Sequence, residues 1–242
     1  MLLGIKQFYG KTLAVSDGEI GRIKDFYFND QQWVVRYVVA DTGTWLPGRL
    51  VLISPHAFGN FHQNGDRLLL NLTRKQIEDG PAMASHRPVS RQYEEEYYDY
   101  YGWPSYWLGG DMWGMGGLPV APPPHLRPSM HAKHSHDNDD PQLRSAKAVT
   151  GYHIQTHEGT IGHVADFAID GRSWAICHLI VTTGHWFSQK EIALPSKDVE
   201  RISYEDSKVF VNVTKEAIQH GREYHVPPAA FQEQTIETNA RI

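Results

Sequence analysis

Short apolar segments alternate with turn sequences in the first 80 residues. The apolar segments lie at 13–15, 20–28, 33–39, 51–53 and 67–71. Asp17-Gly18 separates the first two, and this dipeptide is typical of a β-hairpin because glycine adopts positive φ without a steric penalty. The segment at 33–39 is almost continuously apolar, which indicates a strand buried on both faces. The pattern therefore predicts about five short strands.

A short helix is predicted after the last strand. Thr73 and Gln76 have the spacing of a capping box, in which each side chain accepts a hydrogen bond from the other residue's backbone N–H. So little helix excludes parallel strands joined by helical crossovers. We therefore expect a small antiparallel β-barrel that ends in a short helix.

The second half of the chain repeats the first at an offset of 141 residues. Between 6–80 and 147–221, 15 of the 75 ungapped pairs are identical, and Trp33 aligns with Trp174. An offset that persists across loops indicates an internal duplication. The predicted organisation is a first barrel at 1–80, an irregular linker at 81–145, a second barrel at 146–225 and a C-terminal tail at 226–242. The expected fold class is mainly β, with an aromatic, Pro- and His-rich linker between the barrels.

Composition narrows the class of protein. The 242 residues are 40% hydrophobic and 12% aromatic, which excludes a wholly disordered, collagen-like or coiled-coil chain. The net charge of −5 provides no basic field for nucleic acid. No apolar run approaches the roughly 20 residues that span a bilayer, since Arg36 interrupts the best one. With the single Cys177, these features predict a cytoplasmic protein without a disulfide or a transmembrane segment.

Several of these segments together resemble the PRC-barrel family. The resemblance rests on residues 18–26, the apolar strand ending at Val39, Gly43, residues 51–55 and residues 70–73, and the second repeat shows it again. PRC barrels occur in the H subunit of purple bacterial photosynthetic reaction centres and in a ribosome maturation factor. The resemblance implies a bacterial binding or scaffold protein, with peripheral association with a membrane complex and homo-oligomerisation as open alternatives.

The motifs of common enzyme classes are missing from the sequence. The glycines at 109–117 lack the Lys-Ser/Thr ending of a phosphate-binding loop, and no Gly-x-Ser-x-Gly elbow occurs. Cys177 is interpreted as a small buried residue of the central strand. Asp25 and Asp166 occupy equivalent positions, and we expect each to bind a backbone turn, a catalytic pair being the alternative. We expect no enzyme activity, no catalytic residue and no cofactor.

Aromatic residues provide the candidate partner-binding site. Trp45 and Trp186 follow Thr-Gly in equivalent loops and either cover the barrels or form a paired recognition patch. The linker adds an aromatic run that contains Tyr97, Tyr98, Tyr100, Tyr101, Trp103 and Trp107. Disordered linkers are poor in aromatic residues, so this run either packs on the barrels or docks a protein. The acidic residues at 94–96 would repel nucleic-acid phosphates.

A His/Asp tract in the linker gives the alternative function. His131, His134 and His136 lie among aspartates, and imidazole with carboxylate suits zinc, nickel or copper. The spacing lacks the regularity of a helix-borne metal motif, so we expect no bound metal. The sequence thus predicts a non-enzymatic scaffold that binds a protein, with a metal- or small-ligand-binding protein using this tract or a cleft between the barrels as the alternative.

Overall fold

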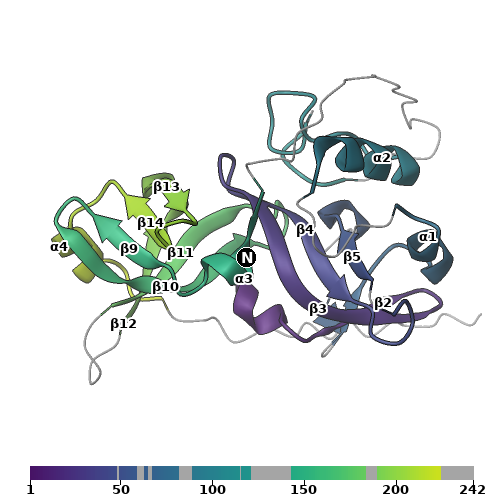
Figure 1. Ribbon diagram of the computed structural model, residues 1–242, viewed down its shortest axis with the longest axis horizontal. Coiled ribbons are helices and arrows are strands. Elements are labelled where there is room, and N and C mark those ends of the chain that lie inside the picture. The colour runs from purple at the N-terminus through teal and green to yellow at the C-terminus, as the bar shows by residue number, and fades with distance from the viewer. Residues whose placement is uncertain are drawn as a thin grey trace, which may run out of the picture.

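The computed structural model consists of two β-sheets and a few short helices (Figure 1). It describes residues 1–47, 49–58, 63–64, 67–81, 89–114, 116–120, 143–183 and 190–224. Each sheet belongs mainly to one of the two repeats, and the sheets lie side by side (Figure 1). The expectation of a mainly β protein is confirmed. Among the described residues, no helix is both long and apolar enough to cross a bilayer.

The two sheets have the same strand order. In the first repeat the strands are β2 (Thr12–Val15), β3 (Gly18–Asn29), β4 (Val34–Asp41), β5 (Leu50–Ile53), β6 (Gln63–Asn64) and β7 (Arg67–Leu69), in the order β5-β4-β3-β2-β7-β6. In the second they are β9 (His153–Thr156), β10 (Gly159–Asp170), β11 (Ile176–Thr183), β12 (Lys190–Pro195), β13 (Val199–Ser203) and β14 (Lys208–Val211), in the order β12-β11-β10-β9-β14-β13. The shared order agrees with a duplication.

Two details of the strand pairing differ from the expected antiparallel barrels. The β2–β7 and β9–β14 pairs are parallel, so the fully antiparallel expectation is wrong at one pair in each repeat. The long stretch between the paired strands makes this possible, because parallel strands need a crossover connection. The hydrogen-bonded path also runs from one end strand to another and does not close within the described residues.

The repeats share their β-bulges as well as their strand order. The β3–β4 register shifts between Ile23 and Asp25, and the β10–β11 register shifts at the equivalent Val164 and Asp166. Near the start of the long strands, a Cβ on Gly21 would lie 2.1 Å from the Asp41 carbonyl oxygen. A Cβ on Gly162 would lie 2.2 Å from the equivalent oxygen of Thr182. This close approach explains why both repeats keep glycine there.

Each repeat gives one strand to the sheet of the other repeat. β1 (Leu2–Gly4) pairs with β10, and β8 (Leu143–Ser145) pairs with β3, both antiparallel. β1 and β8 are related by the same 141-residue offset. The short helices η1 (Ile5–Phe8) and α3 (Ala146–Val149) follow these exchanged strands. The exchange joins the two repeats into one body.

The hairpin turns before β4 and β11 also join the repeats. Trp33 and Trp174 have φ values of 53° and 61°, so they belong to the turns and not to the strands predicted to begin there. Asn29 and Asp170 hold these turns by accepting backbone N–H groups two and three residues ahead. The Val35 N–H then donates to the Trp174 carbonyl oxygen at 3.0 Å.

One hydrophobic core extends through both repeats. The rings of Phe28 and Phe167, from the two long strands, have centroids 5.4 Å apart. Both residues are almost completely buried, as are most residues of β4 and β11. A shared core explains how two units that are each too small to be very stable form a stable whole.

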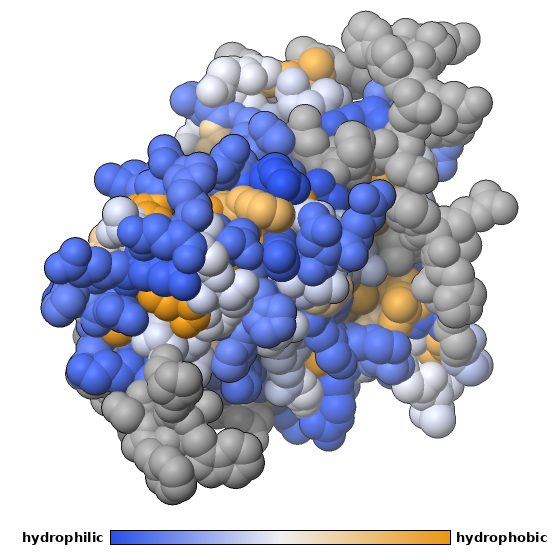
Figure 2. All heavy atoms as spheres, turned by 60° about the vertical axis from the view of Figure 1, so that its left-hand side comes forward, coloured by the Kyte–Doolittle hydropathy of each residue, from blue (hydrophilic) through white to orange (hydrophobic). Residues whose placement is uncertain are grey.

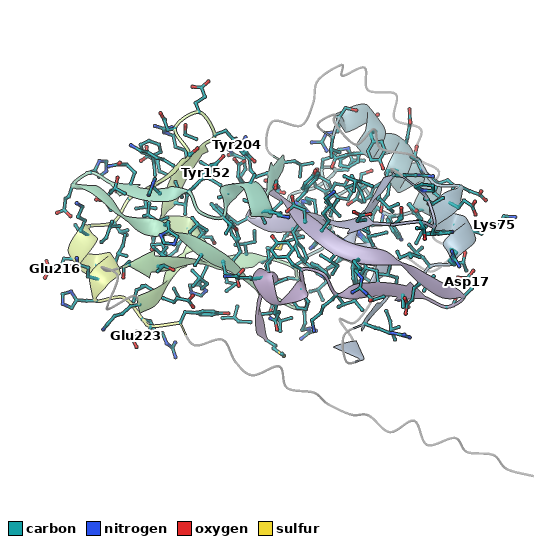
Figure 3. All side chains as sticks on the ribbon, turned by 60° about the horizontal axis from the view of Figure 1, so that its bottom comes forward. Asp17, Lys75, Tyr152, Tyr204, Glu216 and Glu223 are labelled. Atoms are coloured by element: carbon teal, nitrogen blue, oxygen red, sulfur yellow. The ribbon has the colours of Figure 1, made fainter. Side chains whose placement is uncertain are left out.

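The terminal helices α1 (Arg74–Glu78) and α4 (Lys215–Gln219) are capped as the sequence predicts. Thr73 and Gln76 form both halves of the capping box. Acidic residues of the β2–β3 and β9–β10 turns add a second cap to each helix. Asp17 accepts the Arg74 N–H at 2.8 Å, and Glu158 accepts the Lys215 N–H at 2.7 Å. The two helices lie at opposite ends of the molecule, as the labelled Asp17 and Glu216 show (Figure 3).

The linker contains a regular helix, α2 (Arg91–Tyr101), so the expectation of an irregular segment is wrong there. Ser90 caps its first turn by accepting the Tyr93 N–H. Gly102 ends it in the left-handed conformation at φ 64°, where glycine carries no steric penalty. Buried residues at 94, 97, 98 and 101 have helical spacing, which is the signal that identifies the helix in retrospect.

Candidate functional site

The aromatic segment, defined here as residues 89–114 and 116–120, packs on the first repeat. α2 lies over β4 and β5 (Figure 1). Its Tyr97 hydroxyl donates to the Leu52 carbonyl oxygen at 2.9 Å and accepts the Ser54 N–H at 3.0 Å. Tyr97 and Tyr98 are fully buried, and Tyr101 and Trp103 nearly so. The packing alternative of the sequence analysis therefore describes these four side chains.

A buried arginine fastens the loop after α2. Arg36 of β4 has no exposed surface, and its guanidinium lies 3.8 Å from the Tyr106 ring centroid and 4.7 Å from that of Trp113. It donates to the Met112 carbonyl oxygen at 2.7 Å and to the Gln32 side chain. Desolvation and two flanking rings make such a cation–π contact strong. Arg36, which only interrupts the apolar strand in the sequence, thus anchors the segment.

Glu94 is the acidic counterpart of this arginine. It is fully buried in α2 and accepts hydrogen bonds from the hydroxyls of Tyr37 and Tyr106, both at 2.8 Å. Arg91 forms an ion pair with it at 2.9 Å. Removing one partner of such a group is costly, because a charge would remain buried without compensation. Glu94 therefore holds α2 to β4.

His56 completes the cluster as a neutral ring. It stacks on Trp103 with centroids 5.6 Å apart and meets the Trp113 ring edge-on at 5.1 Å. Burial first, and then the charge of Arg36, lower the pKa of His56 to about 3. Its Nδ1 lies 3.0 Å from the Ser54 hydroxyl, while its Nε2 has no hydrogen-bond partner among the described residues. A histidine in this state is part of the packing and is not poised for proton transfer at neutral pH.

The remaining predicted partner-binding residues lie nearer the surface. Tyr100 is 42% exposed and donates to the Gln76 carbonyl oxygen. Trp107 is half-buried beneath the Arg91 guanidinium, at 4.6 Å. Trp45 is also half-buried, with Arg74 4.6 Å from its ring. Trp186 lies outside the described residues, so the proposed Trp45–Trp186 patch stays a prediction.

The aromatic segment also carries most of the exposed large apolar side chains. Seven such residues are exposed in the described part of the chain, and four belong to this segment: Tyr100, Leu108, Leu118 and Val120. Glu96 and Asp99 are exposed on the same helix as Tyr100. The segment therefore exposes both apolar and acidic side chains.

The paired aspartates bind the backbone of the other repeat. Asp25 accepts the N–H groups of Phe26 at 2.7 Å and Lys147 at 3.0 Å. Asp166 accepts those of Phe167 at 2.7 Å and Lys6 at 2.9 Å. The interpretation of a backbone-binding aspartate is therefore confirmed, and the acceptors hold the helices that follow the exchanged strands.

Partial burial changes the ionisation of the two aspartates and of their neighbour Tyr9. Desolvation raises the pKa of Asp166 to about 6, against the lowering effect of its backbone hydrogen bonds. The pKa of Asp25 is also raised by desolvation. Desolvation, followed by both carboxylates, raises the pKa of Tyr9, whose buried hydroxyl has no partner among the described residues. Tyr9 therefore stays protonated at the junction of the repeats.

Of the remaining candidates from the sequence, Cys177 is described and has no reactive setting. Cys177 is a half-buried free thiol in β11, and desolvation raises its pKa, which disfavours the nucleophilic thiolate. His131, His134 and His136 lie outside the described residues. Within the described ranges, no group of three or more His, Cys, Asp or Glu side chains is placed to hold a metal ion.

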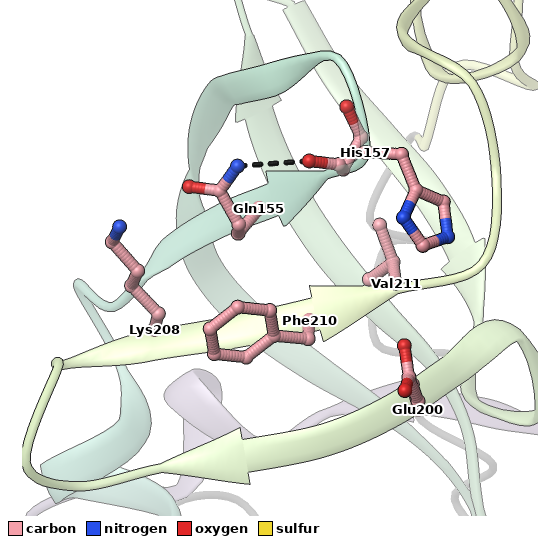
Figure 4. Close-up of a pocket in the computed structure, with 7 residues that line it drawn as sticks. Gln155, His157, Glu200, Lys208, Phe210 and Val211 are labelled. Carbon is pink, nitrogen blue, oxygen red and sulfur yellow. Dashed lines mark hydrogen bonds between the residues drawn. The ribbon is translucent and has the colours of Figure 1, made fainter.

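Two cavities occupy equivalent positions in the repeats, beside the parallel strand pairs. The cavity of the first repeat, about 360 Å³, is lined by Val15, Leu69, Leu70 and Leu72 together with polar residues of the α1 cap. That of the second repeat, about 370 Å³, is lined by Gln155, His157, Glu200, Lys208 and Phe210 with Thr156 and Val211 (Figure 4). Both repeats thus have a cavity at this position, with a mainly apolar lining in the first repeat and a charged and polar lining in the second.

Comparisons of the chain with models of known protein families and with curated proteins find no match.

Proposed function

We propose that this chain is a non-enzymatic, cytoplasmic binding or scaffold protein, built from two PRC-barrel-like units, that docks a protein partner on its aromatic segment. The observation that carries the proposal is the concentration of exposed apolar side chains on one short segment, at Tyr100, Leu108, Leu118 and Val120. Apolar groups within a polar rim are typical of protein interfaces. The acidic Glu96 and Asp99 favour a partner with a basic rim.

The rigid attachment of the segment supports this proposal. Arg36 and Glu94 fix it to β4, so its outer residues are presented without the entropic cost of ordering a free loop. Its inner residues, Tyr97, Tyr98, Tyr101 and Trp103, act as the support for the docking surface. Of the aromatic run predicted to bind a partner, Tyr100 and Trp107 are therefore the residues that would contact it.

The settings of the two aspartates and of the cysteine support a role without catalysis. Asp25 and Asp166 are engaged with backbone N–H groups, and burial disfavours the thiolate of Cys177. The PRC-barrel-like units of this proposal rest on the sequence resemblance, and the shared strand order of the repeats agrees with two copies of one unit. The scaffold function follows from that resemblance and is independent of the histidine tract.

Site-specific photo-crosslinking in the native host tests the docking surface. A photo-reactive amino acid is placed at Leu108 or, as the control, at Glu216 in α4 at the far end of the molecule. We expect one discrete protein adduct from position 108 that is absent from position 216. The proposal fails if position 108 gives no adduct, or if both positions give the same adducts.

A further inference from the structure

The cavity of the second repeat has an unusual arrangement of charges. Lys208 and Phe210 project from β14, and Glu200 lies on β13 (Figure 4). Val199 pairs with Val211 and Ser203 pairs with Lys208. Along the two strands, Phe210 therefore lies between Lys208 and Glu200. Figure 4 shows Lys208 on one side of the Phe210 ring and Glu200 on the other. The cavity therefore has a cationic end, an aromatic middle and an anionic end.

Neither charged group at the ends of the cavity has a partner in the described part of the chain. Among the described residues, no ion pair or hydrogen bond involves the Lys208 ammonium or the Glu200 carboxylate. The Arg201 guanidinium of β13 lies 3.6 Å from the Phe210 centroid, so it covers one face of the ring between them. The two charges are thus available to a ligand.

In the first repeat, the cation at the position equivalent to Lys208 is neutralised by an ion pair. Arg67, the equivalent of Lys208, forms an ion pair with Glu19 at 2.8 Å. The residue equivalent to Glu19 is Thr160, whose hydroxyl donates to the Gln155 side chain at 3.2 Å. The second repeat therefore keeps the cation and lacks its counterion. This difference between duplicated positions indicates a separate use of the second cavity.

We infer that this cavity binds a small dipolar molecule, of the chemistry of an ω-amino acid, in which a carboxylate and an ammonium flank an apolar or aromatic body. Lys208 binds the carboxylate, Glu200 binds the ammonium, and Phe210 contacts the body between them. The volume of about 370 Å³ equals that of roughly a dozen water molecules and lies at the lower end of the range for ligand sites. The face of the molecule that Figure 2 shows, with the second repeat in front, is mostly hydrophilic.

The test is a titration of the full chain with 4-(aminomethyl)benzoate, followed by NMR chemical-shift changes. Benzoate and benzylamine serve as probes with a single charge. We expect the dipolar probe to shift the amides of β13 and β14 and to bind at least tenfold more tightly than either control. Lys208→Met and Glu200→Gln should each weaken binding about tenfold, which corresponds to about 1.4 kcal/mol.

A matched control variant comes from the first repeat. Arg67→Met removes the equivalent cation and should leave binding of the probe unchanged. The inference is wrong if the dipolar probe causes no shifts at about 10 mM, if it binds no better than benzoate, or if Arg67→Met weakens binding as much as Lys208→Met. Because Lys208 is half-exposed and Glu200 is exposed, an unchanged melting temperature separates loss of binding from loss of folding. The outcome is independent of the crosslinking experiment on the aromatic segment.

Discussion

The same face of the sheet is covered in the first repeat and open in the second. On the first repeat, Arg36, Tyr37, Ser54 and His56 are buried beneath α2 and the loop that follows it. The equivalent residues of the second repeat are Cys177, His178, Pro195 and Lys197, and all are half-buried or exposed. A duplicated backbone thus supports a covered face and an open face, and side-chain chemistry decides between them. The aromatic segment therefore covers this face of the first repeat, and it reaches the second repeat through Trp113, whose Nε1 donates to the Ser173 carbonyl oxygen at 2.8 Å.

The largest expected difference between the repeats is at Tyr37 and its equivalent His178. Tyr37→Ala removes a buried ring that contacts Tyr97 edge-on at 5.6 Å and donates to Glu94. We expect a loss of about 3–5 kcal/mol in the free energy of unfolding, whereas His178→Ala should cost less than about 1 kcal/mol. Urea denaturation of both variants measures this. Equal losses would mean that the coverage of the first repeat contributes no extra stability.

The next largest effect is expected from the Asp166 carboxyl, through pH. Its folded-state pKa of about 6 lies above the unfolded value, so folding favours the protonated form. Stability should therefore fall as the pH rises from about 4 to 6, by up to about 3 kcal/mol from this group. Asp166→Asn keeps an oxygen for the N–H groups of Lys6 and Phe167, and it should be more stable than the wild type at pH 7 but not at pH 3.5.

The matched variant for this prediction is Asp25→Asn in the first repeat. Asp25 also accepts a hydrogen bond from the Ser145 hydroxyl at 2.5 Å through its second oxygen, which an amide nitrogen cannot accept. The equivalent of Ser145 is Gly4, so Asp166 has no such partner. Asp25→Asn should gain less stability at pH 7 than Asp166→Asn. A flat difference between Asp166→Asn and wild type across this pH range would refute the assignment.

A smaller loss is expected from Tyr97→Phe. The ring stays in place, but the Ser54 N–H and the Leu52 carbonyl oxygen lose their bonds to the hydroxyl. An unsatisfied buried backbone group costs about 1–3 kcal/mol, so we expect about 2 kcal/mol by urea denaturation. Tyr100→Phe, at an exposed position of the same helix, is the control and should change stability by less than about 0.5 kcal/mol. Similar values for both variants would contradict the buried role of Tyr97.

The smallest effect is expected at the helix caps. Thr73→Ala removes one half of a complete capping box, while Thr214→Ala removes a single cap bond to the Ala217 N–H. Each should cost about 1 kcal/mol, and the loss at Thr73 should be the larger because the Gln76 side chain also loses its reciprocal arrangement. Thermal denaturation resolves the two values. A larger loss at Thr214 would show that the box adds nothing.

Local rules in the sequence account for much of the fold. The hairpin at Asp17-Gly18, the cap at Thr73 and the duplication all follow from spacing that is visible in the chain. The exchange of β1 and β8 does not, because a three-residue strand pairs equally well with either copy of a duplicated partner. The sequence also predicts Trp33 and Trp174 in strands, because both are apolar and lie next to apolar segments, but their positive φ values place them in the turns.

The candidate site was predicted only in part, for a similar reason. The aromatic run is visible in the sequence, but the residues that hold it in place are distant in the chain. Arg36 looks like an interruption of an apolar strand, and His56 follows β5 in the short helix η2 (Pro55–Ala57). Glu94 belongs to the acidic run at 94–96, which the sequence predicts to repel phosphates, although its side chain is fully buried. The cavity beside Lys208 depends on the absence of a counterion at Thr160, which becomes evident once the strands are paired.

Hydrogen exchange of the Trp103→Ala variant tests the central claim most directly. Because α2 and Trp103 cover the sheet face of the first repeat, removing Trp103, which stacks on Tyr101 at 4.5 Å and on His56, should speed exchange in α2 and in residues 50–58. Exchange in the equivalent residues 191–199 of the second repeat should remain as in the wild type. Faster exchange in both repeats to the same extent, or no change in residues 50–58, would contradict the account.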